Sequence, residues 1–231
     1  MSKAFDRVDH SLLLVKLKHI GLPTSYLKWL SSYILNRQQQ VTVLGATSKP
    51  LQVASGVPQG SILGPILFLV YSSDILSPCD RGAMYADDLK CYRSINSHDD
   101  AHLFQTEINS VSVATENCHL NFNGLKCSVL KITRKKNTVQ YPYQLNDTPL
   151  PLVSKINDLG VLVTSNLDWS DHTYKICKKA NKMLGLLRRC TLEFHNPQTR
   201  RLLYLTIVRS SFSYASQLWS PQKVELIQEM E

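Results

Sequence analysis

Apolar residues recur at helical spacing in two stretches near the start of the chain. The first is the leucine-rich run of residues 11–18, which stops before Gly21, and the second extends from Tyr26 to Leu35 with Thr24 or Ser25 as its cap. Apolar positions three and four residues apart form one face of a helix, and glycine or a capping hydroxyl marks the helix ends. The pattern therefore predicts two helices that each bury one face.

Polar and apolar residues alternate from Gln39 to Leu44, which is the period of a half-buried strand. Residues 45–49 supply a turn that contains glycine, and a second strand is predicted from Leu51 to Ala54. The apolar stretch that follows predicts a helix from Ile62 to Leu76. A hairpin between helices is therefore expected in the first third of the chain.

The middle of the chain predicts one long helix and several strands. The helix begins at His98 and runs to about Asn117, and strands are predicted at 129–133, 139–145 and 156–163 with polar turns between them. Strands that are grouped apart from the helices favour an antiparallel sheet with helices on one face. The sequence therefore predicts an α+β fold.

Helical periodicity dominates the last part of the chain. Apolar residues such as Ile176 and Ala180 recur at helical spacing, and Asn196-Pro197 is typical of the start of a further helix. We therefore divide the chain into a mixed region, residues 1–169, and a helical region, residues 170–231.

The composition favours a compact protein that binds a polyanion. The 231 residues are 43% hydrophobic and carry a net charge of +8, which suits a packed core and contact with phosphates. The six cysteines include no Cys-x-x-Cys pair, so reduced thiols are expected rather than a zinc site. No stretch has the pattern of a signal peptide, and the apolar run at 66–71 is far too short to cross a bilayer. An intracellular protein is expected.

Two adjacent carboxylates, Asp87 and Asp88, stand between apolar and aromatic residues of strand type. This arrangement predicts a β-hairpin with the acidic pair at its turn. Carboxylate oxygens select hard divalent ions such as Mg²⁺, and two such ions can stabilise both the attacking and the leaving oxygen of a phosphoryl transfer. A solvated turn is the alternative interpretation of an isolated acidic pair.

Residues 55–65 form a second unusual segment, with three glycines and two prolines directly before the apolar run at 66–71. Glycine lets a backbone approach a ligand closely, and proline stiffens the loop around it. Alone, the segment is typical of a loop that enters a buried helix. Followed by Tyr85 to Asp88, it matches a known pattern.

These motifs resemble a reverse transcriptase of the non-LTR, LINE-type retrotransposon class, near the jockey-like elements. The matching segments occur in the family's order from the first residues nearly to the last. They are residues 2–10, 55–65, 85–88, Asn123 with Lys126 and Cys127, 158–161, 167–169 with His172, 214–216 and 219–221. Each motif alone is weak, whereas the ordered set is specific.

The resemblance implies a polymerase palm in the mixed region and a thumb in the helical region, with the family's fingers missing. Lys3-Ala4-Phe5-Asp6 matches the end of the family motif Asp-x-x-Lys-Ala-Phe-Asp, so the first metal-binding aspartate is expected directly before Met1. Asp6 and Asp9 are not expected to replace it, because Asp6 matches the second aspartate of the motif, which is not the metal ligand. In addition, residues five or six apart in a strand lie about 16 to 20 Å apart. An N-terminally truncated domain is therefore expected.

The implied reaction is the addition of deoxynucleoside triphosphates to a DNA primer on an RNA template, with two Mg²⁺ ions bound by Asp87 and Asp88. Nucleotide contacts are expected from Phe5, Gln59, Gly60, Tyr85 and Lys126. A primer grip is expected at Asp158, Leu159 and Gly160. Nucleic-acid phosphates are expected along one basic helix face, formed by Lys175, Lys178, Lys179, Lys182, Arg188 and Arg189.

Three functions are open at this point. The first is a fragment of an RNA-directed DNA polymerase, a nucleotidyltransferase of the nucleus or cytoplasm, whose activity depends on the missing aspartate. The second is a catalytically inactive remnant that binds nucleic acid through the same basic face. The third is an unrelated metal-dependent nuclease, which uses Asp87 and Asp88 but leaves the loop at 55–65 without a role.

Overall fold

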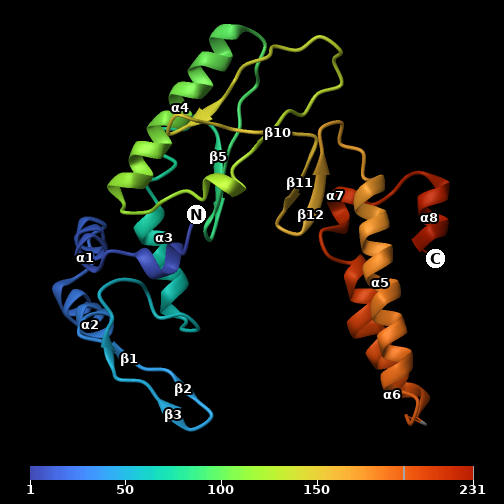
Figure 1. Ribbon diagram of the computed structural model, residues 1–231, viewed down its shortest axis with the longest axis horizontal. Helices are drawn as coiled ribbons and strands as arrows, with labels where there is room; N and C mark the ends of the chain where they lie inside the picture. The colour runs from blue at the N-terminus through green and yellow to red at the C-terminus, as the bar shows by residue number, and fades with distance from the viewer. Residues whose placement is uncertain (195, 231) are drawn as a thin grey trace. The chain divides into compact units, whose positions relative to one another are not determined.

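The computed structural model describes residues 1–194 and 196–230 (Figure 1). Contacts within the chain separate it into two compact units. Unit 1 comprises residues 1–127 and 137–150, and unit 2 comprises residues 128–136 together with those from 151 onward. The chain therefore leaves unit 1 for a short excursion into unit 2 and returns before it completes unit 2.

Six helical segments form much of unit 1. They are η1 (Ala4–Arg7), α1 (His10–His19), α2 (Thr24–Ile34), α3 (Leu63–Ser72), α4 (His98–Asn117) and η2 (Gly124–Lys126). The α-helices confirm the four that the apolar pattern predicts in this part of the chain. The predicted cap of α2 is wrong, because Thr24 is its first residue and Pro23 stands at the capping position without a side-chain hydrogen bond. The fixed φ of proline suits a helix start without such a bond.

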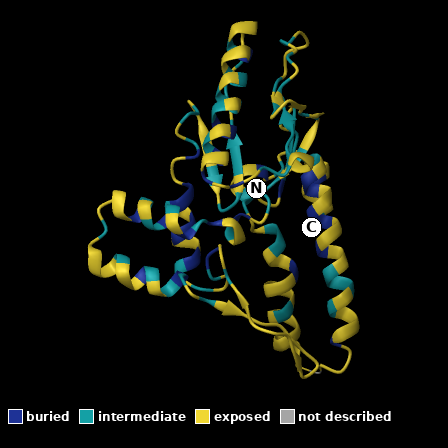
Figure 2. Cartoon of the chain, turned by 60° about the vertical axis from the view of Figure 1, so that its left-hand side comes forward, coloured by how far each residue is buried: buried dark blue, intermediate teal, exposed yellow. Residues whose placement is uncertain are grey.

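The strands of unit 1 are short and antiparallel. The pairs are β1 (Gln38–Gln39) with β4 (Leu51–Gln52), β2 (Thr42–Val43) with β3 (Ala46–Thr47), β5 (Gly82–Tyr85) with β6 (Asp88–Cys91), and β8 (Gln144–Leu145) with β9 (Thr148–Pro149). The first two pairs form one exposed arm (Figure 2). Its turn lies at Leu44 and Gly45, which both have positive φ, rather than across the predicted residues 45–49. Of the strand predicted at 139–145, only β8 forms.

The core of unit 1 lies among α1, α2 and α3. Leu13, Ile34 and Phe68 are fully buried there. Tyr71 is also fully buried, and its hydroxyl donates to the carbonyl of Cys118 at 2.6 Å. Burial raises the pKa of Tyr71 to about 12, so the phenol stays neutral and hydrogen-bonded inside the core.

Unit 2 begins with two small sheets. β7 (Val129–Leu130) pairs with β10 (Leu152–Val153) in parallel, and β11 (Lys155–Asp158) pairs with β12 (Val161–Thr164) antiparallel. The single strand predicted over 156–163 is therefore wrong, because Leu159 and Gly160 adopt positive φ and fold it into a hairpin. The predicted antiparallel sheet is also wrong for the described residues, in which every sheet has two strands.

Helices complete unit 2. They are α5 (Ser170–Cys190), α6 (Pro197–Leu203), η3 (Tyr204–Val208), η4 (Arg209–Phe212), α7 (Ser216–Trp219) and α8 (Val224–Met230). The predicted change to helices at residue 170 is confirmed. Asn196 caps α6 by accepting a hydrogen bond from the amide of Gln198 at 2.8 Å, as the Asn-Pro signal indicates.

The core of unit 2 joins motifs that are distant in the sequence. Trp219 is 1% exposed, and the His172 ring meets it edge-on with centroids 5.1 Å apart. Nδ1 of His172 accepts a hydrogen bond from the amide of Leu162 at 3.0 Å, and the Trp219 indole donates to the carbonyl of Tyr214 at 2.8 Å. The segments at 167–172 and 214–221 are therefore core-forming motifs of this unit.

Helices and short hairpins in separate stretches of the chain make this an α+β fold, as predicted. Among the described helices, none combines the length and the apolar character needed to span a membrane. The assignment of residues 1–169 to a palm and 170–231 to a thumb stays a prediction.

Candidate functional site

The acidic pair lies where β5 turns into β6. Tyr85 pairs with Asp88, so Ala86 and Asp87 form a two-residue turn, and Ala86 takes a left-handed φ of 51°. Asp87 is half-buried, whereas Asp88, the first residue of β6, is exposed. The predicted hairpin is therefore confirmed, and it holds both carboxylates within one short segment.

The start of the chain lies against this turn. The α-amino group of Met1 donates to the carbonyl of Asp87 at 2.8 Å, and the amide of Ser2 donates to the carbonyl of Asn121 at 2.9 Å. The N-terminal segment is therefore held against the turn that carries Asp87, although Met1 and Asp87 are far apart in the sequence.

The glycine-rich loop is bound to the same N-terminal segment. The amide of Gly56 donates to the carbonyl of Val8 at 2.8 Å, and the amide of Val57 donates to the carbonyl of Phe5 at 2.9 Å. A Cβ atom on Gly56 would stand 2.9 Å from the Cα of Asp6, closer than side chains approach a backbone. Glycine at 56 therefore allows the loop and the N-terminal segment to touch.

Phe5, in the N-terminal segment, and Gln59, in the loop at 55–65, differ in how far they are buried. The Phe5 ring stacks on Phe68 with centroids 4.4 Å apart, and it packs against the core of unit 1. The amide of Gln59 is exposed and donates to a carboxylate oxygen of Asp6 at 2.6 Å. Gly60 is exposed, with open space where a side chain would stand. Gln59 and Gly60 are therefore accessible to a ligand, and Phe5 is only partly so.

The described carboxylates do not form a complete metal site. In residues 1–194 and 196–230, no three His, Cys, Asp or Glu side chains gather in a way that could hold an ion. Asp9 instead caps α1 by accepting from the amide of Leu12 at 2.8 Å, which holds the pKa of its carboxyl below the usual range. Asp87 and Asp88 supply the hard oxygen ligands that Mg²⁺ prefers, but a site needs further donors beside them.

Tyr85 and Lys126 are both exposed in unit 1, and they come from β5 and from the end of η2. The amide of Lys126 donates to the carbonyl of Asn123 at 2.9 Å, which fixes the backbone of this short turn. Neither side chain is committed to the core, so both are available for contact with a ligand.

The predicted primer grip is the turn between β11 and β12. Leu159 has a φ of 45° and Gly160 a φ of 91°. The hydroxyl of Tyr214 donates to the carbonyl of Leu159 at 2.8 Å, so a residue from the C-terminal part of unit 2 fixes the turn. The resemblance pointed to these residues, but the sequence gave no signal for the role of Tyr214 as the support of the turn.

The six basic residues predicted for nucleic-acid contact all lie on α5 and are all exposed. The opposite side of the helix buries Ile176, Cys177 and Ala180. Lys175 donates to the side chain of Asn157 at 2.7 Å, and the helix has one acidic residue, Asp171. By helical spacing, five of these residues share the side opposite the buried one: Lys175, Lys178, Lys179, Lys182 and Arg189. Arg188 falls nearer the apolar side, although it is exposed.

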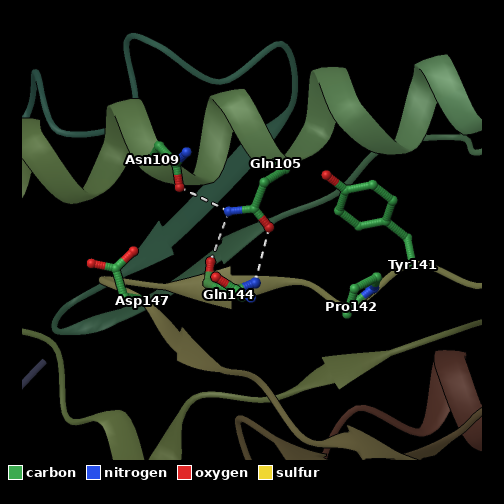
Figure 3. A pocket seen from close by; sticks show the side chains of 6 residues that line it. All are labelled: Gln105, Asn109, Tyr141, Pro142, Gln144 and Asp147. Atoms are coloured by element: carbon green, nitrogen blue, oxygen red, sulfur yellow. Dashed lines mark hydrogen bonds between the residues drawn. The ribbon is translucent and has the colours of Figure 1, made fainter.

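A polar hollow lies between α4 and the segment at 141–147, as Figure 3 shows. The Gln105 side chain dominates it, because its carbonyl oxygen accepts from the amide of Gln144 at 2.9 Å and its nitrogen donates to the Gln144 carbonyl at 2.9 Å. The same nitrogen donates to Asn109 at 2.8 Å. The Gln105 side chain thus hydrogen-bonds to the backbone of Gln144 as a neighbouring strand would. We interpret this hollow as a structural contact that holds β8 against α4, and the sequence did not predict it.

Two thiols lie near the acidic hairpin. Sγ of Cys79 and Sγ of Cys91 are 2.7 Å apart, and Cys91 is the last residue of β6. Burial raises the pKa of both thiols, so both are protonated at neutral pH. All six cysteines are free in the structure, and the reduced state expected from the sequence stays a prediction.

Comparison with known proteins gives a consistent picture. A family described as reverse transcriptase (RNA-dependent DNA polymerase) matches residues 1–162. The chain is 33% identical over 229 residues to the "Probable RNA-directed DNA polymerase from transposon X-element" of Drosophila melanogaster, which covers 94% of this chain and 25% of that protein.

Two further relatives come from the same organism. The "Probable RNA-directed DNA polymerase from transposon BS" is 29% identical over 95% of this chain and 26% of its own length. The "RNA-directed DNA polymerase from mobile element jockey" is 31% identical over 76% of this chain and 20% of its own length. The chain thus spans about a quarter or less of the curated relatives that it matches.

Proposed function

The chain belongs to the reverse transcriptase family, and from this premise we propose that it is a catalytic segment of a jockey-like, LINE-type retrotransposon polymerase. Its role is to place the β5–β6 hairpin where a primer end and an incoming deoxynucleotide meet on an RNA template. The observation that carries the proposal is the contact between Met1 and Asp87. It supports a three-carboxylate site, because the family motif has its aspartate directly before Met1.

Asp87 and Asp88 are the residues that would hold divalent metal ions, together with a carboxylate at the position before Met1. When bound, such ions neutralise the charge that develops on the transferring phosphoryl group. Since only two of these carboxylates belong to the described residues, an inactive nucleic-acid-binding segment is the second candidate function for this chain by itself.

The loop at 55–65 is proposed to shape the pocket for the nascent base pair. Gln59 offers a donor and an acceptor, and Gly60 lets a base or backbone approach closely. Phe5, held by its stack on Phe68, is proposed to exclude a ribose 2′-hydroxyl, the group that distinguishes RNA from DNA. Tyr85 and Lys126 are proposed to contact the nucleotide from the hairpin and from the end of η2.

Unit 2 is proposed to hold the primer–template duplex. The turn at Asp158, Leu159 and Gly160 would support the primer end through its backbone, which Tyr214 fixes. The basic face of α5 would follow phosphates without reading the base sequence, because lysine and arginine contact the phosphate charge alone.

A chimera tests the proposed function directly. Residues 1–231 replace the matching segment of the X-element polymerase, so that the relative supplies the preceding sequence. The chimera should incorporate deoxynucleotides on an RNA template, and Asp87→Asn should reduce the rate by about 10² to 10³. Asp99→Asn, at an exposed position of the first turn of α4, is the matched control and should leave the rate unchanged.

Residues 1–231 expressed alone should show no measurable primer extension, since the first aspartate and the fingers expected from the family are not among these residues. Two results contradict the proposal. One is a folded, primer-binding chimera without incorporation, and the other is a chimera in which Asp87→Asn has no more effect than Asp99→Asn.

A further inference from the structure

The outer face of α2 exposes aromatic rings. Tyr26 is 59% exposed and Trp29 is 55% exposed, whereas Leu30 and Ile34 on the opposite side are buried in the core. Tyr33 continues the aromatic row, and its ring lies nearly parallel to that of Trp29, with an interplanar angle of 20° and centroids 6.3 Å apart. Three rings at helical spacing thus form one row along the helix.

The surface beside these rings is hollowed. Ser25, Tyr26 and Trp29 line the hollow, which is shallow and open to solvent, so one polar and two aromatic side chains border it. Lys28 and Ser32 are exposed on the same helix, and no exposed aliphatic side chain belongs to α2. This surface therefore combines aromatic rings with hydroxyl groups and an ammonium group. It differs from the aliphatic grooves that bind amphipathic helices of other proteins.

The charge around α2 is one-sided. Residues 10–73 contain no Asp or Glu at all and five Lys or Arg side chains: Lys16, Lys18, Lys28, Arg37 and Lys49. Lys16 is paired with Asp74 at 2.5 Å, which leaves four basic side chains for the surface of α1, α2 and the β1–β4 arm. The field at this surface therefore attracts a polyanion.

We propose that the outer face of α2 binds single-stranded nucleic acid by stacking unpaired bases on Tyr26 and Trp29, with Lys28 and Arg37 near the phosphates. Every base has a π face, so an aromatic platform with basic neighbours binds single strands with little sequence preference. This surface uses none of the residues assigned above to nucleotide, metal or primer contact. The proposed ligand is an unpaired strand, because the basic side chains suit its phosphates and the exposed rings suit its bases.

The proposal can be tested without divalent ions, so its outcome is independent of the polymerase assignment. Binding of two eight-nucleotide probes, an oligouridylate RNA and an oligothymidylate DNA, is measured in EDTA. The protein carries Lys178→Gln, Lys179→Gln and Lys182→Gln, which weakens contact with α5. Trp29→Leu and Tyr26→Leu should each weaken binding by about 5- to 150-fold, the range for loss of one base stack. Trp29→Phe keeps a ring and should lose less.

Tyr92→Leu is the matched control, because Tyr92 is 53% exposed and lies outside α2. Oligonucleotides with 5-iodouracil should crosslink to Trp29 or Tyr26, as mass spectrometry of the peptides would reveal. RNA and DNA should behave alike, since stacking does not use the 2′-hydroxyl.

Three outcomes overturn the proposal, each with folding verified by circular dichroism. If Trp29→Leu and Tyr26→Leu bind as tightly as Tyr92→Leu and no crosslink forms on α2, the rings of α2 do not stack on bases. If the leucine variants lose as much affinity for a duplex of the same length as for the single strand, the surface contacts phosphates only. A dimer in sedimentation that Trp29→Leu dissociates indicates that a second copy covers this face.

Discussion

Gly56 is the residue at which the loop comes closest to the N-terminal segment. It has a φ of +92°, and a side chain there would meet the backbone of Asp6 and Phe5 at 2.9 to 3.0 Å. The sequence predicts that a glycine in this loop permits close approach, and the partner observed at Gly56 is the protein's own backbone. Gly56 therefore keeps in register the two segments that carry Phe5 and Gln59.

Gly56→Ala should lower the free energy of unfolding by about 2 to 5 kcal/mol, because the positive φ and the backbone clash add. Gly45→Ala is the control, since Gly45 has a φ of +84° and open space around it. It should cost only about 1 to 2 kcal/mol. Urea unfolding measures both, and equal losses would mean that the contact with Asp6 adjusts at no cost.

His172 gives unit 2 a pH-dependent stability. Its Nδ1 accepts a hydrogen bond from Leu162, its Nε2 is buried without a partner among the described residues, and the ring is 2% exposed. Burial, and to a smaller extent Lys175, lower the pKa of His172 from its ordinary value of 6.5. The neutral imidazole is therefore the form that fits the folded unit.

The unfolded chain binds a proton at His172 more readily than the folded chain, so stability should fall as the pH drops below 6.5 and should stop falling below the lowered pKa. His172→Gln should reduce the difference between pH 7.5 and 5.5 in urea unfolding followed by Trp fluorescence, whereas His102→Gln, at an exposed position of α4, should not. An undiminished difference in His172→Gln would assign the effect to other groups.

At the scale of elements, α5 combines an apolar side with a basic side, and the sequence showed both. Apolar spacing predicted the buried residues, and the remaining positions carry the lysines and arginines. This prediction held because helical periodicity is a local property. Whether the basic side binds phosphates is a separate matter, which a titration with salt decides.

Replacing Lys178, Lys179 and Lys182 together by Gln should reduce the slope of log K against log salt for a primer–template duplex by about 2 to 3. The same three positions changed to Arg keep the charge and should keep the slope. Asp87→Asn should leave the slope unchanged or act in the opposite direction, because it removes a negative charge. An unchanged slope in the triple Gln protein, with its fold intact, would make α5 an ordinary solvated helix.

The strands show where local reasoning ends. The β5–β6 hairpin was predicted because its alternating residues and its turn are adjacent in sequence. The continuous antiparallel sheet was not found, and β7 pairs in parallel with β10 across a long excursion of the chain. Such pairing depends on contacts that no short window of sequence contains, so the helices were better predicted than the sheets.

For the molecule as a whole, the sequence supplied the family and the acidic hairpin but not the contacts that assemble the site. Met1 with Asp87 and Gln59 with Asp6 join segments 86 and 53 residues apart. The contact between Met1 and Asp87 uses main-chain groups only, so no pattern of side chains in the sequence could predict it. These contacts make the N-terminal segment the bridge between the loop and the hairpin of unit 1.

The central claim is that Asp87 and Asp88 form a metal site with a carboxylate at the position before Met1. Mn²⁺ binding, followed by electron paramagnetic resonance, tests it on two proteins that carry either Asp or Asn directly before Met1. The Asp protein should bind Mn²⁺ at least about fivefold more tightly, because one more carboxylate near a divalent ion contributes about 1 kcal/mol or more even in water. Asp87→Asn should abolish that advantage. Equal affinities of the Asp and Asn proteins, both folded, would contradict the claim.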